Sequence, residues 1–142
     1  MKMMWGLCMV LSGGLAAGSA SADDSTKGSA SDTRVFELRT YYPHPGKMEA
    51  LHARFRDHTC KLFEKHGMTV VGFWVPEARD QADAKLVYML AFPNRDAARK
   101  SWAAFLADPD WKTARQASEV NGPLVKRLES VFLSPTDYSP MK

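Results

Sequence analysis

Two oppositely charged residues, Glu37 and Arg39, lie two positions apart in a short apolar segment that is typical of a β-strand. Alternate residues of a strand point to the same face of its sheet, so the two side chains share a face. A strand-like segment near the end of the chain carries Arg127 and Glu129 at the same spacing. If the two strands are neighbours and these faces coincide, the four residues form a cross-strand cluster of charges.

Two interpretations of this charge cluster remain open. In the first it is a structural network, because buried charges are stable only when they are paired. In the second it is a polar patch that binds an anionic ligand. The structural interpretation is favoured, because many perturbed ion pairs in proteins serve structure alone.

Aromatic side chains and one histidine extend the candidate site. Most of the aromatic residues are expected in the core, and a few are expected to line a pocket between sheet and helices, where a tyrosine hydroxyl is the polar group. His58 lies beside the apolar stripe of the first predicted helix and is expected to face the sheet. A structural role at the edge of the core accounts for this histidine more simply than a role as a ligand. The candidate ligand-binding residues are Glu37, Arg39, Tyr41, His58, Trp74, Tyr88, Arg127 and Glu129.

Several chemistries lack their motifs in this sequence. There is no G-x-G-x-x-G, P-loop, G-x-S-x-G or C-x-x-C pattern, and no two histidines are spaced four apart, so no metal site is predicted. Cys60 is the one cysteine beyond the first ten residues and is expected to be buried and inert. The net charge is +3, with acidic and basic residues alternating along the chain, so no nucleic-acid partner is predicted.

Hydrophobic periodicity predicts the order β-α-β-β-α-β. An apolar stripe at three-to-four spacing predicts the first helix, which Gly67 ends, and Asn94 is expected to cap the second. A short helix is expected to restart at Asp108, with Pro109 in its first turn. The predicted strands are 35–42, 69–75, 85–92 and 124–133, and the predicted helices are 47–66 and 94–107. This order predicts an α+β, ferredoxin-like fold: a four-stranded antiparallel sheet in the order 4-1-3-2 with two helices on one face.

The third predicted strand, residues 85–92, is apolar on both faces and should therefore be covered on both sides. The two helices can cover only one face of the sheet. A second copy of the chain is the economical cover for the other face, so a homodimer with sheet against sheet is predicted.

The first 34 residues differ in composition from the rest. Residues 1–22 have a positive start, an apolar run and an A-x-A pattern that ends at Ala22, which is the layout of a secretory signal peptide. The apolar run is too short for a membrane span. Residues 23–34 are small and polar and are expected to form a disordered linker. The mature domain, residues 35–140, is therefore expected to be exported, to the periplasm or outside the cell.

Three stretches of the chain together resemble the NIPSNAP family: "FELRTYYPHPGKMEALHARFRDHTCKLFEKHGMTVVGFW", "RDAARKSWAAFLADPDWK" and "VFLSPTDYSP". The resemblance covers about Val35 to Pro140. It implies a dimeric α+β barrel, in agreement with the predicted homodimer, but it implies little biochemistry. Eukaryotic members are linked to mitochondria and to vesicle or mitophagy signalling, whereas the leader fits an exported bacterial member, and bacterial members mostly have no assigned activity.

Two functions follow as hypotheses. The first is a non-catalytic homodimeric module outside the cytoplasm that binds a small apolar ligand or a protein partner and needs no cofactor. The second is a small monooxygenase, cofactor-free or haem-dependent, by analogy with antibiotic-biosynthesis monooxygenases and haem-degrading proteins of the same architecture. In the haem-dependent version, His58 is the expected axial ligand.

Overall fold

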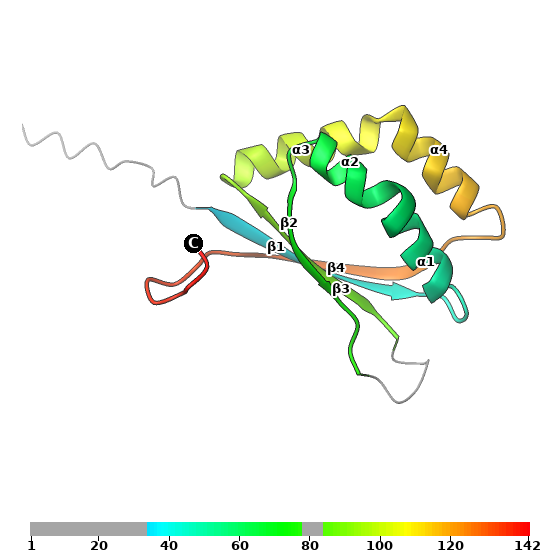
Figure 1. The fold of residues 1–142 in the computed structure, drawn as a ribbon, viewed down its shortest axis with the longest axis horizontal. Helices are drawn as coiled ribbons and strands as arrows, with labels where there is room; N and C mark the ends of the chain where they lie inside the picture. Colours follow the sequence, from blue (N-terminus) through cyan, green and yellow to red (C-terminus); the bar gives the residue numbers. More distant parts are fainter. Residues whose placement is uncertain (1–33, 78–83) are drawn as a thin grey trace, which may run out of the picture.

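Four strands form one antiparallel sheet in the computed structural model, which describes residues 34–77 and 84–142 (Figure 1). The strands are β1 (Val35–Pro43), β2 (Thr69–Trp74), β3 (Leu86–Phe92) and β4 (Val125–Leu133). Their order across the sheet is β2-β3-β1-β4, which confirms the predicted ferredoxin-like order. The predicted signal peptide, and all of the predicted linker except Arg34, lie outside the described residues.

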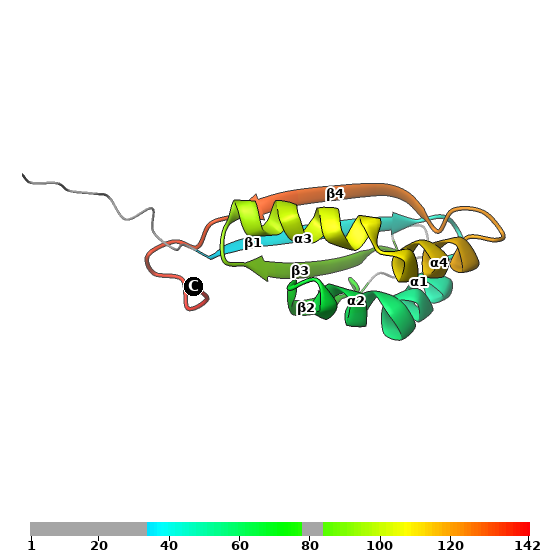
Figure 2. The ribbon, with the colours of Figure 1, turned by 90° about the horizontal axis from the view of Figure 1, so that it is seen from above.

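The helices all lie on one face of this sheet, as Figures 1 and 2 show from two directions. They are α1 (Met48–Arg54), the π-helical turn η1 (Phe55–Thr59), α2 (Cys60–Lys65), α3 (Arg95–Ala107) and α4 (Pro109–Ser118). Asn94 caps α3 as predicted, because its side chain accepts a hydrogen bond from the backbone N–H of Ala97. Asp108 caps α4 in the same way through the N–H of Asp110.

The first predicted helix is not continuous. A π-helical turn, η1, separates α1 from α2, and its extra residue per turn shifts which side chains face the sheet. Arg54 and Phe55 are both buried at the start of this turn, and Thr59 is buried at its end. The Thr59 hydroxyl donates to the backbone carbonyl of Arg54 at 3.2 Å, which holds a polar side chain at this buried position.

Asp108 also joins α4 to the end of α2. Its second carboxylate oxygen accepts hydrogen bonds from His66 Nε2 at 2.6 Å and from Lys65 Nζ at 2.8 Å. Hydrogen bonds from Lys65 and His66 hold the pKa of the Asp108 carboxyl well below its ordinary value. The ionised side chain therefore caps one helix and ties it to another.

The lowered pKa of Asp108 predicts a loss of stability at low pH. Its contribution is fully present above the ordinary aspartate pKa of about 3.9 and is lost as the pH falls toward the lower folded pKa. Asparagine caps helices as well as aspartate, so Asp108→Asn can keep the cap. It removes the charge and the oxygen that accepts hydrogen bonds from Lys65 and His66. We expect the urea midpoint of the wild type to exceed that of Asp108→Asn at about pH 6, and this difference to become smaller at about pH 2.5. Asp96→Asn, at an exposed ion pair, is the control and should show no comparable gap; a constant gap for Asp108→Asn would contradict the prediction.

The core lies between the sheet and the helices and is built largely from aromatic rings. Phe63 of α2 is one of its central residues, because its ring lies 5.1–6.2 Å from the rings of four others. These four are Phe55, Tyr88, Trp102 and Phe105. Edge-to-face and tilted pairs of this kind stabilise a core beyond the area that they bury.

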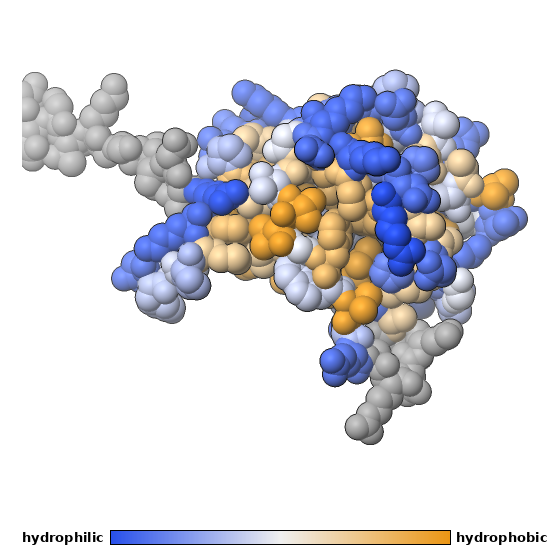
Figure 3. Space-filling view, viewed as in Figure 1, coloured by the Kyte–Doolittle hydropathy of each residue, from blue (hydrophilic) through white to orange (hydrophobic). Residues whose placement is uncertain are grey.

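The face of the sheet away from the helices carries exposed apolar side chains. Val131 of β4 is 53% exposed there and Trp74 of β2 is 49% exposed. Figure 3, which views the molecule from its β2 side as Figure 1 does, shows hydrophobic side chains gathered in the middle with hydrophilic ones around them. We call the side of the sheet away from the helices the open face; it carries Phe36, Leu38, Thr40, Tyr42, Val87, Met89, Val131 and Leu133.

Candidate functional site

Glu37 lies in the centre of the sheet, on the face that the helices cover. It is 2% exposed, and its carboxylate accepts three hydrogen bonds. Arg39 Nη1 donates at 3.0 Å, Ser130 Oγ of the neighbouring strand β4 at 2.6 Å, and Trp102 Nε1 of α3 at 2.5 Å. The buried charge is thus paired and hydrogen-bonded from two strands and a helix, which is the condition for keeping it in a core.

Arg39 lies between this carboxylate and a wall of aromatic rings. Its guanidinium carbon is 4.1 Å from the ring centroid of Trp102 and 5.7 Å from that of Tyr41, so it makes cation–π contacts with both. Burial opposes its charge, but the surrounding groups, Glu37 among them, outweigh burial and raise the pKa of Arg39. Arg39 is therefore a fixed positive charge.

Tyr88 completes this side of the site from strand β3. Its ring centroid is 5.3 Å from that of Tyr41. Burial raises the pKa of Tyr88 well above its ordinary value, so the phenol stays neutral. Its hydroxyl is buried and has no hydrogen-bond partner among the described residues.

Arg54 is a second buried arginine, and the sequence analysis missed it. It is 5% exposed, and its Nη1 donates to Glu119 at 3.0 Å and to Ser118 Oγ at 3.3 Å. Its guanidinium carbon lies 5.3 Å from the ring centroid of Trp111. One signal was available, because Arg54 follows Leu51 by three residues and so falls on the apolar stripe of the helix.

Arg39 and Arg54, with the tryptophans that they contact, border one pocket of about 340 Å³ at the β4 edge of the sheet, which we call the arginine pocket. Strands β1 and β4 form its floor, and α3 and α4 form its sides. Its lining residues are Arg39, Tyr41, Arg54, Trp102, Phe105, Leu106, Trp111, Arg115, Glu119, Pro123, Val125 and Leu128. A largely apolar wall with a few fixed polar groups is the usual form of a small-molecule site.

Four of the predicted site residues, Glu37, Arg39, Tyr41 and Tyr88, are brought together here. Arg127 and Glu129 are not, so the predicted cluster of four charges is wrong. The register pairs Arg39 with Ser130 and Tyr42 with Arg127, which places Arg127 and Glu129 on the open face. There they pair with each other, and the Tyr42 hydroxyl donates to Glu129 at 2.9 Å.

His58 does not face the sheet. It is exposed and lines a groove between η1 and α2 on one side and α4 on the other, together with Lys61 and Thr113. The π-helical turn explains the error, because it brings Thr59, the next residue, to the buried side. A haem held between the sheet and the helices could not have His58 as its axial ligand, so the residues present do not fit the predicted haem site.

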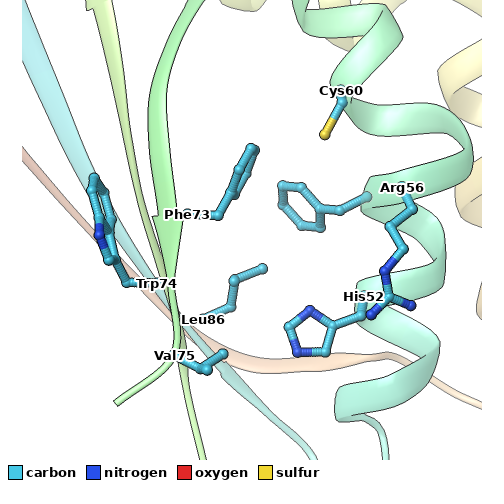
Figure 4. A pocket seen from close by; sticks show the side chains of 8 residues that line it. His52, Arg56, Cys60, Phe73, Trp74, Val75 and Leu86 are labelled. Atoms are coloured by element: carbon cyan, nitrogen blue, oxygen red, sulfur yellow. The ribbon is translucent and has the colours of Figure 1, made fainter. Parts of the chain in front are cut away.

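Trp74 lies at the opposite edge of the sheet, beside a second pocket of about 270 Å³ (Figure 4). Figure 4 shows Phe73 pointing into this pocket and Trp74 pointing away from it, on the other side of β2. The Trp74 ring covers Gly72, where a Cβ would lie 2.7 Å from the ring. The pocket is lined by His52, Phe55, Arg56, Cys60, Phe73, Trp74, Val75 and Leu86.

Cys60 is half-buried in the wall of this second pocket, so the expectation of full burial was too strong. Burial raises the pKa of its thiol, which disfavours the reactive thiolate and agrees with the expectation of an inert cysteine.

Residues 34–77 and 84–142 contain no group of three or more histidine, cysteine or acidic side chains placed to hold a metal ion. None of the helices in these ranges is long and apolar enough to cross a membrane.

Several solved structures share this fold. A NIPSNAP family protein of unknown function from Agrobacterium tumefaciens is 21% identical, with a TM-score of 0.66 over 79% of this chain and 96% of its own. An uncharacterized NIPSNAP-like domain protein from Burkholderia xenovorans is 17% identical, with a TM-score of 0.66 over 77% and 90%. SnoaB, a cofactor-independent oxygenase from Streptomyces nogalater, is 18% identical, with a TM-score of 0.51 over 76% and 98%.

Identities this low establish a common fold and do not by themselves transfer a function. None of the curated proteins matches the chain. The sequence pattern that defines the NIPSNAP family matches residues 36–140, which is most of the chain. The chain therefore belongs to the NIPSNAP family.

Proposed function

We propose that this NIPSNAP domain is a non-catalytic binding module that holds a small ligand in the arginine pocket. The observation that carries the proposal is the buried Glu37, which fixes Arg39 against Trp102 at the wall of a cavity lined mostly by aromatic and aliphatic side chains. Preorganised polar groups in an apolar wall orient a ligand with little loss of entropy on binding.

The state of the polar groups supports binding more than catalysis. A general base needs an acceptor within reach of the substrate, but the Glu37 carboxylate already accepts from Arg39, Trp102 and Ser130. Tyr88 is kept neutral by burial. These groups are suited to set the shape and the charge of the pocket. The proposed module needs no cofactor.

The proposed module is a homodimer that acts outside the cytoplasm. The apolar open face supports the homodimer, because a second copy would remove it from water. The leader of residues 1–22 supports export, and a mature chain that begins near Asp23, found by mass spectrometry of the cell-envelope and medium fractions, would establish it.

Ligand-observed NMR with a set of small aromatic compounds tests the binding proposal. Leu128 lines the arginine pocket and is 42% exposed, so Leu128→Trp should fill the pocket without disturbing the core. We expect compounds that bind the wild-type protein to lose at least about tenfold in affinity in this variant, because the added ring occupies their site. Met141→Trp, at a residue of similar exposure far along the chain, is the matched control.

Two results would defeat this proposal. One is that no compound of the set binds the wild-type protein. The other is that binding is equal in wild type and Leu128→Trp, because the ligand would then lie elsewhere.

A cofactor-free monooxygenase is the second candidate function. It is favoured by the aromatic pocket with Arg39 and Tyr41 on its wall, and the SnoaB oxygenase shares the fold. An oxygen electrode separates the two candidates: the binding module consumes no oxygen above the buffer rate with reduced quinol substrates, whereas an oxygenase does. Uptake that Arg39→Gln abolishes would favour the oxygenase.

A further inference from the structure

Two arginine–tryptophan pairs border the arginine pocket, and each is joined to a glutamate. In the first, Arg39 contacts Trp102 and donates to Glu37. The second is built by different elements: Arg54 lies 5.3 Å from the Trp111 ring centroid and donates to Glu119. The pocket thus has two fixed guanidinium groups held against flat aromatic surfaces.

Both arginines have more hydrogen-bond donors than the protein satisfies. Each uses Nη1 for its glutamate, and the Nε of each is buried without an acceptor in the described part of the chain. The Nη2 atoms of both arginines donate to no described residue, and neither atom is fully buried. A buried guanidinium with unpaired donors is costly unless an acceptor completes it.

The charges around the pocket are also unbalanced. Arg115 at the rim adds a third positive charge, whereas Glu37 and Glu119 supply two negative charges. One positive charge is left beside an apolar wall that includes Phe105 and Leu128. A ligand that complements this pocket has a flat apolar body and a single negative charge.

We infer that the arginine pocket binds a monoanionic aromatic carboxylate, whose carboxylate accepts hydrogen bonds from Arg39 and Arg54 while its rings lie against Trp102 and Trp111. The inference rests on the proposed binding function and adds the chemical class of the ligand. The volume of about 340 Å³ is at the lower end of small-molecule sites, which suits a body of two fused rings.

A pair of compounds that differ only in charge tests the inference. We use 2-naphthoate and 2-naphthalenemethanol, which have the same ring system, in isothermal titration calorimetry with the purified protein. Hydrogen bonds from arginine to a carboxylate are about twice as strong as neutral ones, so the carboxylate should bind on the order of tenfold more tightly than the alcohol.

Variants of the two arginines then test whether the carboxylate of the ligand is recognised in this pocket. Arg39→Gln and Arg54→Gln should each reduce the preference for the carboxylate to within about threefold, and Arg39→Lys should keep part of it because the charge remains. Arg99→Gln, on the exposed side of α3, is the control and should retain the full preference. Circular dichroism checks that each variant folds. If Arg54→Gln does not fold, the two variants Arg39→Gln and Arg39→Lys decide whether the inference holds.

The outcomes separate the inference from the function on which it rests. Equal binding of naphthoate and alcohol, lost in Leu128→Trp, would overturn the anionic class and leave the binding module in place. Binding of neither compound would count against both. A preference for the carboxylate that survives both arginine-to-glutamine changes would also overturn the inference, because the recognition would lie outside the pocket.

Discussion

Replacing Glu37 by alanine is expected to lower the free energy of unfolding by about 3–5 kcal/mol, because it removes one partner of a buried ion pair. Arg39 would keep its charge in the core with no counter-ion. The indole N–H of Trp102 and the hydroxyl of Ser130 would lose their acceptor at the same time. The change leaves a small cavity as well, which adds to the cost.

Urea denaturation followed by tryptophan fluorescence measures this loss. Glu129→Ala is a matched control on the same sheet, because Glu129 also pairs with an arginine two residues away, but on the open face with its side chain 48% exposed. An exposed pair of this kind contributes about 1 kcal/mol or less. Equal losses for the two variants would show that the Glu37 network does not stabilise the core.

The contrast between Glu37 and Glu129 marks how far the sequence alone could predict the site. The strand period placed Glu37 and Arg39 on one face correctly, and the apolar stripe of the helices placed the core. The pairing of β1 with β4 depends on register, and a shift of one residue moves every side chain of a strand to the other face. No local pattern in the sequence specified that Arg39 would pair with Ser130 and not with Glu129.

The helical half of the site was hidden for a different reason. The π-helical turn η1 adds a residue to one turn, so positions counted from an ideal helix are displaced beyond it. His58 was therefore expected at the sheet. Arg54 precedes this turn and lies on the apolar stripe, so the turn does not explain why it was missed. The partner that keeps Arg54 buried, Glu119, is 65 residues away in the chain, and only the tertiary fold brings them together.

The open face predicts the state of assembly. It presents Leu38, Val87 and Met89 in its centre, with the half-exposed Val131 beside them. Helices cover only the opposite face in the described part of the chain (Figures 1 and 2). Because exposed apolar faces of this kind favour association, the purified protein is expected to sediment as a dimer at micromolar concentration.

Val131→Glu is expected to weaken this dimer by about a hundredfold or more, because each copy would bring an unpaired carboxylate into an apolar two-fold interface. The same change should cost the single chain little, about 0.5 kcal/mol, because Val131 is 53% exposed there. Sedimentation velocity and urea denaturation together therefore separate assembly from folding. Val120→Glu, at a 79% exposed residue after α4, is the control and should remain dimeric. A wild-type protein that sediments as a folded single chain would refute the homodimer, and with it the view that a second copy covers the open face.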